Sequence, residues 1–108
     1  METVCLRVRL KPGSLNRVHE WATELRTRSE EVLATLRDEG VLVESAFLGS
    51  DEQGDFLIYY MKARSLTEAQ EAVKGSIHPI DQYHQQFKVE TWESRTPLEL
   101  LIDFENFS

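Results

Sequence analysis

Cysteine is nearly absent from this chain, and no stretch of it is apolar enough or basic enough to favour a membrane or a nucleic acid as partner. The single cysteine, Cys5, excludes a disulfide within the chain. No apolar run approaches the roughly 20 residues that span a bilayer. The 12 lysines and arginines are scattered, and 19 acidic residues bring the formal net charge to -7. Such a surface repels phosphate backbones and anionic lipids, which argues against both as partners.

We expect no leader peptide at the beginning of the sequence, and the motifs of common enzymes are missing from it. Its acidic start, Met1-Glu2, differs from the basic beginning of a signal peptide, so we expect a cytoplasmic protein. There is no glycine-rich phosphate loop and no Gly-x-Ser-x-Gly, and His19, His78 and His84 do not have metal-ligand spacing. We therefore predict no metal and no cofactor. A length of 108 residues with 41% hydrophobic residues predicts one globular domain over residues 1–108.

Hydrophobic periodicity predicts a mixture of strands and helices. Alternation predicts a first strand, and apolar residues at helical spacing predict one long helix that ends at Gly40. A capping box, Ser65 to Glu68, begins a short helix that ends at Gly75, and Pro79 begins another helix. The predicted strands are Val4–Leu10, Val41–Leu48, Phe56–Met61 and Leu98–Phe104, with the long helix at Leu15–Glu39 and a hairpin loop at 49–54.

The order β-α-β-β-α-(α)-β predicts a ferredoxin-like α+β fold, which has a four-stranded antiparallel sheet with helices on one face. The strand Phe56–Met61 is apolar on both faces, so the side of the sheet without helices would expose large apolar groups. Packing against the sheet of a second copy removes that patch. The sequence therefore predicts a homodimer formed through the open sheet faces.

This element order, with its long first helix and half-polar open sheet, resembles the dimeric α/β-barrel superfamily. The stretch from His78 to Phe87 (HPIDQYHQQF), leading into a C-terminal strand, is similar to a family of small uncharacterised bacterial proteins in that superfamily. More distantly, the chain resembles the antibiotic-biosynthesis-type monooxygenases, which need no cofactor. The resemblance implies a dimeric barrel with a cavity. Haem-degrading members use an asparagine from the sheet, and the first strand here has none.

His84 is the first candidate for chemistry, because it lies on the apolar stripe of the helix that begins at Pro79, between Tyr83 and Phe87. A partly buried imidazole there changes its pKa readily through the neutral range. One interpretation makes His84 a general base at the edge of the cavity, with Tyr83 and Phe87 as ligand contacts. The alternative makes it a core-edge histidine bonded to a backbone carbonyl. His78 is interpreted as a helix cap or a contact at the cavity mouth.

A second set of candidates consists of polar residues that strand alternation can place together on the open sheet face. These are Arg7, Arg9, Glu44, Tyr59 and Asp103. Alternation places the two arginines on this face clearly, whereas the face on which Glu44 and Tyr59 lie is less certain from the pattern. Two arginines in a semi-enclosed cavity bind a carboxylate or an enolate, with Tyr59 as a donor. In the alternative, Arg7 pairs with Glu44 or Asp103 across a dimer interface and no ligand is bound.

Three functions remain open on this sequence. The first is a dimeric barrel that binds a small organic molecule between sheet and helices. The second is a cofactor-independent monooxygenase or isomerase, in which His84 accepts a proton and Arg7 or Tyr59 stabilises an oxyanion. The third is a purely structural or regulatory dimer whose barrel is filled by side chains.

Overall fold

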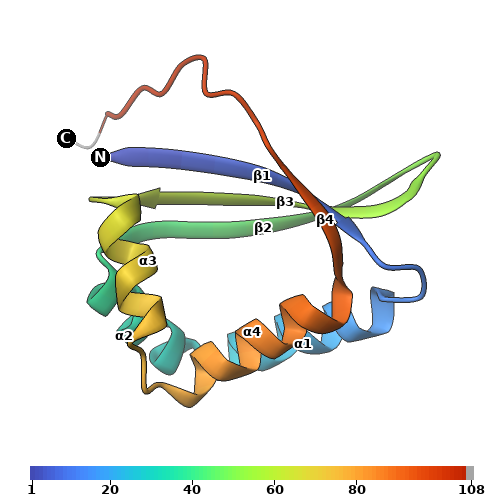
Figure 1. The fold of residues 1–108 in the computed structure, drawn as a ribbon, viewed down its shortest axis with the longest axis horizontal. Helices are drawn as coiled ribbons and strands as arrows, with labels where there is room; N and C mark the ends of the chain where they lie inside the picture. Colours follow the sequence, from blue (N-terminus) through green and yellow to red (C-terminus); the bar gives the residue numbers. More distant parts are fainter. Residues whose placement is uncertain (107–108) are drawn as a thin grey trace.

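Four strands and four helices follow one another in the order β-α-α-β-β-α-α-β in the described part of the chain, residues 1–106 of a computed structural model. The strands form one antiparallel sheet in the order β2-β3-β1-β4. All the helices lie against one face of this sheet, which leaves the other face without a helix (Figure 1). The elements are β1 (Glu2–Leu10), α1 (Leu15–Thr27), α2 (Ser29–Glu39), β2 (Val41–Asp51), β3 (Gly54–Ala63), α3 (Leu66–Lys74), α4 (Pro79–Thr91) and β4 (Trp92–Pro97). The predicted ferredoxin-like fold is confirmed.

Apolar side chains of the two central strands form the main core with helices α1 and α4. Val8 and Leu57 are directly opposite each other in the sheet and both point to the helices, where Phe87 is fully buried. Trp21 stacks on Phe87 with ring centroids 4.3 Å apart. A smaller cluster of Val41, Ala63 and Ala69 lies under α2 and α3. The two clusters place α1 and α4 over one end of the sheet and α2 and α3 over the other (Figure 1).

The prediction of a single helix over Leu15–Glu39 is wrong at one point, since the helix is broken at Arg28. The backbone of Arg28 has φ -106° and ψ 35°, outside the helical region. No glycine or proline marks the break in the sequence. The two halves pack on different partners, α1 on α4 and α2 on α3 and β2. A straight helix cannot cover both core clusters, so tertiary packing overrides local helix propensity here.

The last strand is also not where the sequence predicted it. The strand β4 begins at Trp92, directly after α4, and ends at Pro97, while the predicted segment Leu98–Phe104 has no regular structure. Proline at the end of an edge strand is compatible with pairing, because its missing N–H is not needed there. After Pro97 the tail is held to β1 by the Leu98 N–H, which donates to the Cys5 carbonyl at 2.9 Å.

Two local predictions are confirmed by side-chain and backbone geometry. The Ser65 hydroxyl accepts a hydrogen bond from the Glu68 N–H at 3.2 Å, which is the Ser65 half of the predicted capping box. Helix α4 begins at Pro79. Among residues 1–106, no helix is both long enough and apolar enough to cross a membrane.

Candidate functional site

A chain of hydrogen bonds links four side chains between the sheet and helices α1 and α4. The Trp21 indole N–H donates to His84 Nδ1 at 3.0 Å. His84 Nε2 lies 3.2 Å from the Tyr59 hydroxyl, and that hydroxyl in turn donates to the Glu44 carboxylate. The four residues come from α1, α4, β3 and β2, so only the folded chain brings them together.

The directions of these bonds determine the protonation of His84. Because the indole N–H can only donate, His84 Nδ1 must accept and carries no proton. A neutral ring then has its proton on Nε2, which donates to the Tyr59 oxygen. Burial, followed by repulsion from the Lys88 ammonium, lowers the pKa of His84 to about 3. His84 is therefore a neutral donor in this arrangement, and its basic nitrogen is already occupied.

Glu44 is the acidic end of the chain, and burial raises its pKa. Its nearest charged neighbours include Asp81, which raises this pKa further, and Lys88, which lowers it. Burial also lowers the pKa of Lys88. No ion pair joins Glu44 to Lys88 within residues 1–106, although each affects the pKa of the other. Glu44 and Lys88 thus interact electrostatically without forming an ion pair.

A cavity of about 140 Å³ lies between α2, α3 and the beginning of α4, and none of the four hydrogen-bonded side chains lines it. Its walls include Glu39 and Asp81, the carboxylates that interact with Glu44. Burial, followed by repulsion from Asp81, raises the pKa of Glu39 to about 7. His78 also lines this cavity, and its Nε2 lies 2.7 Å from Asp38.

The prediction that all five polar candidates share the open sheet face is wrong for Glu44 and Tyr59. Tyr59 is paired with Leu6, and both point to the helices. Glu44 joins this side because the pairing of β2 shifts between Val41 and Val43. The extra residue of such a bulge reverses the alternation of everything after it.

Arg7 and Arg9 do lie on the open face, and they share the carboxylate of Asp51 rather than that of Glu44 or Asp103. The Arg9 guanidinium bonds Asp51 at 3.0 Å, and Arg7 makes a second ion pair with it. The bond from Arg9 is the main reason that the pKa of Asp51 falls to about 2. The Arg7 guanidinium also stacks on Phe56, 3.9 Å from the ring centroid. The sheet separates this cluster from His84, so Arg7 cannot act together with that residue.

Asp103 lies on the open side as well, but in the tail rather than in a strand. Its carboxylate accepts hydrogen bonds from Thr3 at 2.6 Å and from the Lys62 ammonium at 2.9 Å. Glu105 adds a second ion pair to Lys62 at 3.0 Å. The tail is thereby fixed along the open face near the N-terminus (Figure 1).

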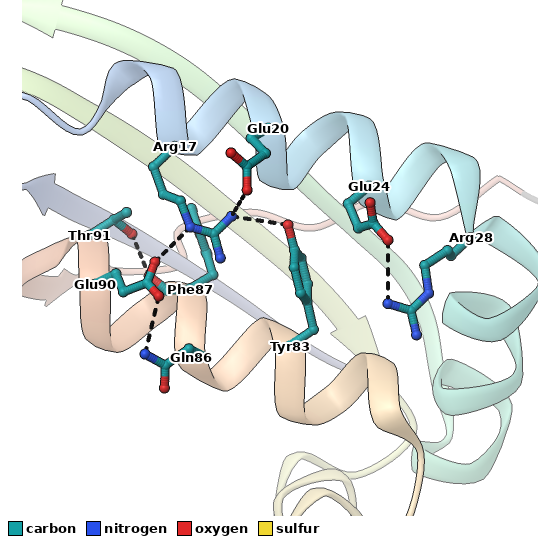
Figure 2. Close-up of polar contacts among 9 residues, drawn as sticks. All are labelled: Arg17, Glu20, Glu24, Arg28, Tyr83, Gln86, Phe87, Glu90 and Thr91. Atoms are coloured by element: carbon teal, nitrogen blue, oxygen red, sulfur yellow. Dashed lines mark hydrogen bonds and ion pairs between the residues drawn. The ribbon is translucent and has the colours of Figure 1, made fainter.

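Tyr83 and Phe87, the predicted ligand contacts on α4, are engaged with α1 (Figure 2). The Arg17 guanidinium donates to the Tyr83 hydroxyl at 3.0 Å and to Glu90 at 2.7 Å. Phe87 is 0% exposed and packs on Trp21. Both side chains therefore have structural partners, and their part in ligand binding stays a prediction.

Sequence reasoning missed Glu39, Asp81 and Lys88. Asp81, His84 and Lys88 follow the spacing i, i+3, i+7, which places them on one face of α4 beside the apolar stripe. This polar row was visible in the sequence, but the same pattern is equally typical of a helix face exposed to solvent. Within residues 1–106, no three histidine, cysteine, aspartate or glutamate side chains are grouped to hold a metal.

The topology defines the class of protein: a ferredoxin-like α+β domain, with its polar cluster between sheet and helices. The chain belongs to a family of unknown function, DUF6176, whose model matches residues 1–108. No curated protein matches the sequence.

Solved structures share the fold at low sequence identity. An L-rhamnose mutarotase from Formosa agariphila superimposes with a TM-score of 0.64 and 19% identity, covering 97% of this chain and 100% of that one. A putative antibiotic biosynthesis monooxygenase from Nitrosomonas europaea gives a TM-score of 0.57 and 14% identity, covering 91% and 94%. A further antibiotic biosynthesis monooxygenase gives 0.58 and 16%, covering 98% and 100%. Identities this low show the fold alone.

Proposed function

We propose that this protein binds a small organic molecule between its sheet and helix α4, against Glu44, Tyr59 and His84. The observation that carries the proposal is the hydrogen-bonded chain through these residues between the sheet and the helices. Buried polar groups cost stability unless they are paired, and a buried carboxylate costs more than an apolar side chain of similar size. Glu39 and Asp81, which line a cavity of about 140 Å³, interact electrostatically with Glu44, and this favours a binding role over packing.

Native mass spectrometry of the purified protein under gentle desolvation tests this proposal. We expect extra mass on the protein, and we expect Tyr59→Phe and Glu44→Gln to reduce it. The matched control is Glu52→Gln, an exposed carboxylate in the hairpin between β2 and β3. Bare protein in every preparation, together with no thermal stabilisation by a library of small polar molecules, would leave the filled-barrel interpretation as the better one.

A second candidate, an isomerase that moves protons without a cofactor, is favoured by the raised pKa of Glu44 and its bond to Tyr59. In mutarotation a base removes the proton of the anomeric hydroxyl, an acid protonates the ring oxygen, and the bond between the anomeric carbon and that oxygen breaks. Closure on the other face of the carbonyl returns both protons. Glu44 suits the role of proton acceptor better than His84, whose Nδ1 is occupied.

Saturation-transfer NMR on L-rhamnose tests the isomerase, since a similar fold carries that activity. We expect faster exchange between the two anomers with the wild-type protein and loss of that acceleration in Glu44→Gln. The His84→Ala variant should lose rate through misplaced Tyr59 rather than through a missing base. Equal rates for wild-type and Glu44→Gln protein would refute the assigned role.

We also propose that two copies pack through their open sheet faces. Phe47 on this face is 62% exposed, and Ile58 and Tyr60 beside it are partly exposed. Sedimentation equilibrium should give about twice the chain mass of 12.5 kDa, and Phe47→Asp should give the monomer. A monomeric wild-type protein at micromolar concentration would contradict this assembly.

A further inference from the structure

Three hydrogen-bond donors near the C-terminal end of α4 have no acceptor within residues 1–106. The indole N–H of Trp92 is buried and makes no hydrogen bond. The Lys88 ammonium lies 4.9 Å from the centroid of the Trp92 ring and forms no ion pair. Arg95 is paired with Val8 in the sheet, so it lies on the helix side; this residue is exposed and forms no ion pair. A buried indole N–H usually has a partner, so its lack of one indicates a missing group.

Lys88 is unusual among the basic residues of the described chain. The formal net charge is -7, which makes carboxylates plentiful. Six basic residues form an ion pair with a carboxylate: Arg7, Arg9, Arg17, Arg28, Lys62 and Lys74. Of the six that form none within residues 1–106, five are exposed and Lys88 alone is not. Burial is the main reason that the pKa of Lys88 is lowered, and the Arg95 guanidinium lowers it further, whereas Glu44, Glu39 and Asp81 raise it. An anionic ligand group in contact with Lys88 offsets the cost of burying its charge.

The donors adjoin the proposed binding site. Lys88 follows His84 by four residues and so lies on the same face of α4. The Tyr59 ring meets the Trp92 ring edge-on, with centroids 6.0 Å apart. Trp92 and Lys88 are thus direct neighbours of Tyr59 and His84 in the proposed binding site.

We propose that the bound molecule carries a carboxylate, and that Lys88, Arg95 and the Trp92 N–H bind this group. The inference rests on the proposed binding function and adds the chemical class of the ligand. Lys88 and Arg95 provide charge, and the indole N–H provides a directed bond. Asp81 and Glu39, at the other end of α4, repel a carboxylate and so fix the orientation of the molecule.

The chain has two tryptophans, so an ¹⁵N-labelled sample gives two indole signals, one for each end of the site. Trp92→Phe assigns them. The probes are matched pairs of a carboxylate and its amide: benzoate and benzamide, lactate and lactamide, D-glucuronate and D-glucuronamide. Each is titrated at constant ionic strength to about 20 mM, which detects dissociation constants in the millimolar range.

We expect at least one carboxylate to shift the Trp92 signal saturably, with its amide at least about tenfold weaker, as charge-assisted bonds require. Lys88→Gln and Arg95→Gln should each weaken the carboxylate by a similar factor. The control is Lys74→Gln on α3, whose side chain is 75% exposed. If Lys74→Gln weakened carboxylate binding as much as Lys88→Gln does, only the net charge of the protein would matter, and the inference would be overturned.

The remaining outcomes separate this inference from the proposed function. Equal affinities for a carboxylate and its amide, with both indole signals moving, would keep the binding site and overturn the carboxylate class. No shift with any probe would overturn both.

Discussion

Glu39 provides the sharpest test of the electrostatics around the site. Burial and the nearby carboxylates of Asp81 and Glu44 raise its pKa from the ordinary 4.5 to about 7. A raised pKa means that the folded state favours the protonated form. The stability from this group is complete below pH 4.5 and is lost as the pH rises through 7. The variant Glu39→Gln cannot ionise, so it avoids that loss.

The size of this loss of stability follows from the difference between the ordinary and the folded-state pKa of Glu39, which is about 2.5. At about 1.36 kcal/mol for each pKa unit, a fully buried group would lose about 3.4 kcal/mol. Glu39 is half-buried, and solvent screening reduces the effect by about half. We therefore expect Glu39→Gln to be more stable than the wild type by about 1–2 kcal/mol at pH 8, and about equal to it at pH 4.

Urea unfolding at fixed protein concentration, followed by tryptophan fluorescence from pH 4 to pH 8, measures this difference. The exposed Glu52→Gln variant is the control and should track the wild type throughout. A free-energy difference for Glu39→Gln that stays constant with pH would refute the reasoning, because it would mean that Glu39 titrates normally in the fold. A difference that grows toward acid pH would contradict the sign.

Three further substitutions test packing and the hydrogen-bonded chain by urea unfolding. Trp21→Phe removes the donor to His84 Nδ1, so we expect a loss of about 1–2 kcal/mol and a change in the imidazole ¹⁵N shifts; unchanged shifts would contradict the assigned tautomer. Phe87→Ala empties a fully buried site and should cost about 3–5 kcal/mol; less than about 1 kcal/mol would mean that the core collapses around it. Gly49→Ala places a methyl 2.6 Å from the Phe56 ring and should cost about 1 kcal/mol, whereas no loss would show that the ring turns away freely.

The sequence predicted the arrangement of elements because the periodic segments were long and their ends were marked. The alternation of Val4–Leu10, the glycine at 40 and the capping box at Ser65 are local signals, and the structure uses each of them. The break at Arg28 has no such signal. The helix breaks because its two halves pack on two separate core clusters, and no local pattern of residues predicts where those clusters lie.

The site was predicted in part for the same reason. His84 was identified from its place on a helical stripe, which is a local property. Its partners Glu44 and Tyr59 depend on the phase of two strands, and the irregular pairing at Val41–Val43 decides that phase for Glu44. A one-residue change reverses every later side chain in a strand. Composition and spacing cannot detect it, so the two residues were grouped with Arg7 on the opposite face.

The division of polar groups between the two faces of the sheet bears on which of them has a function. On the open face, Arg7 and Arg9 are satisfied by Asp51, and these side chains remain in contact with water. On the helix face, Glu44 and Lys88 are withdrawn from water without an ion pair between them, and the Trp92 N–H has no partner. Apolar residues at these positions would stabilise the fold at least as well. Polar groups that weaken a core are expected where a ligand supplies the missing contacts, and this supports the binding site that we propose between the sheet and helix α4.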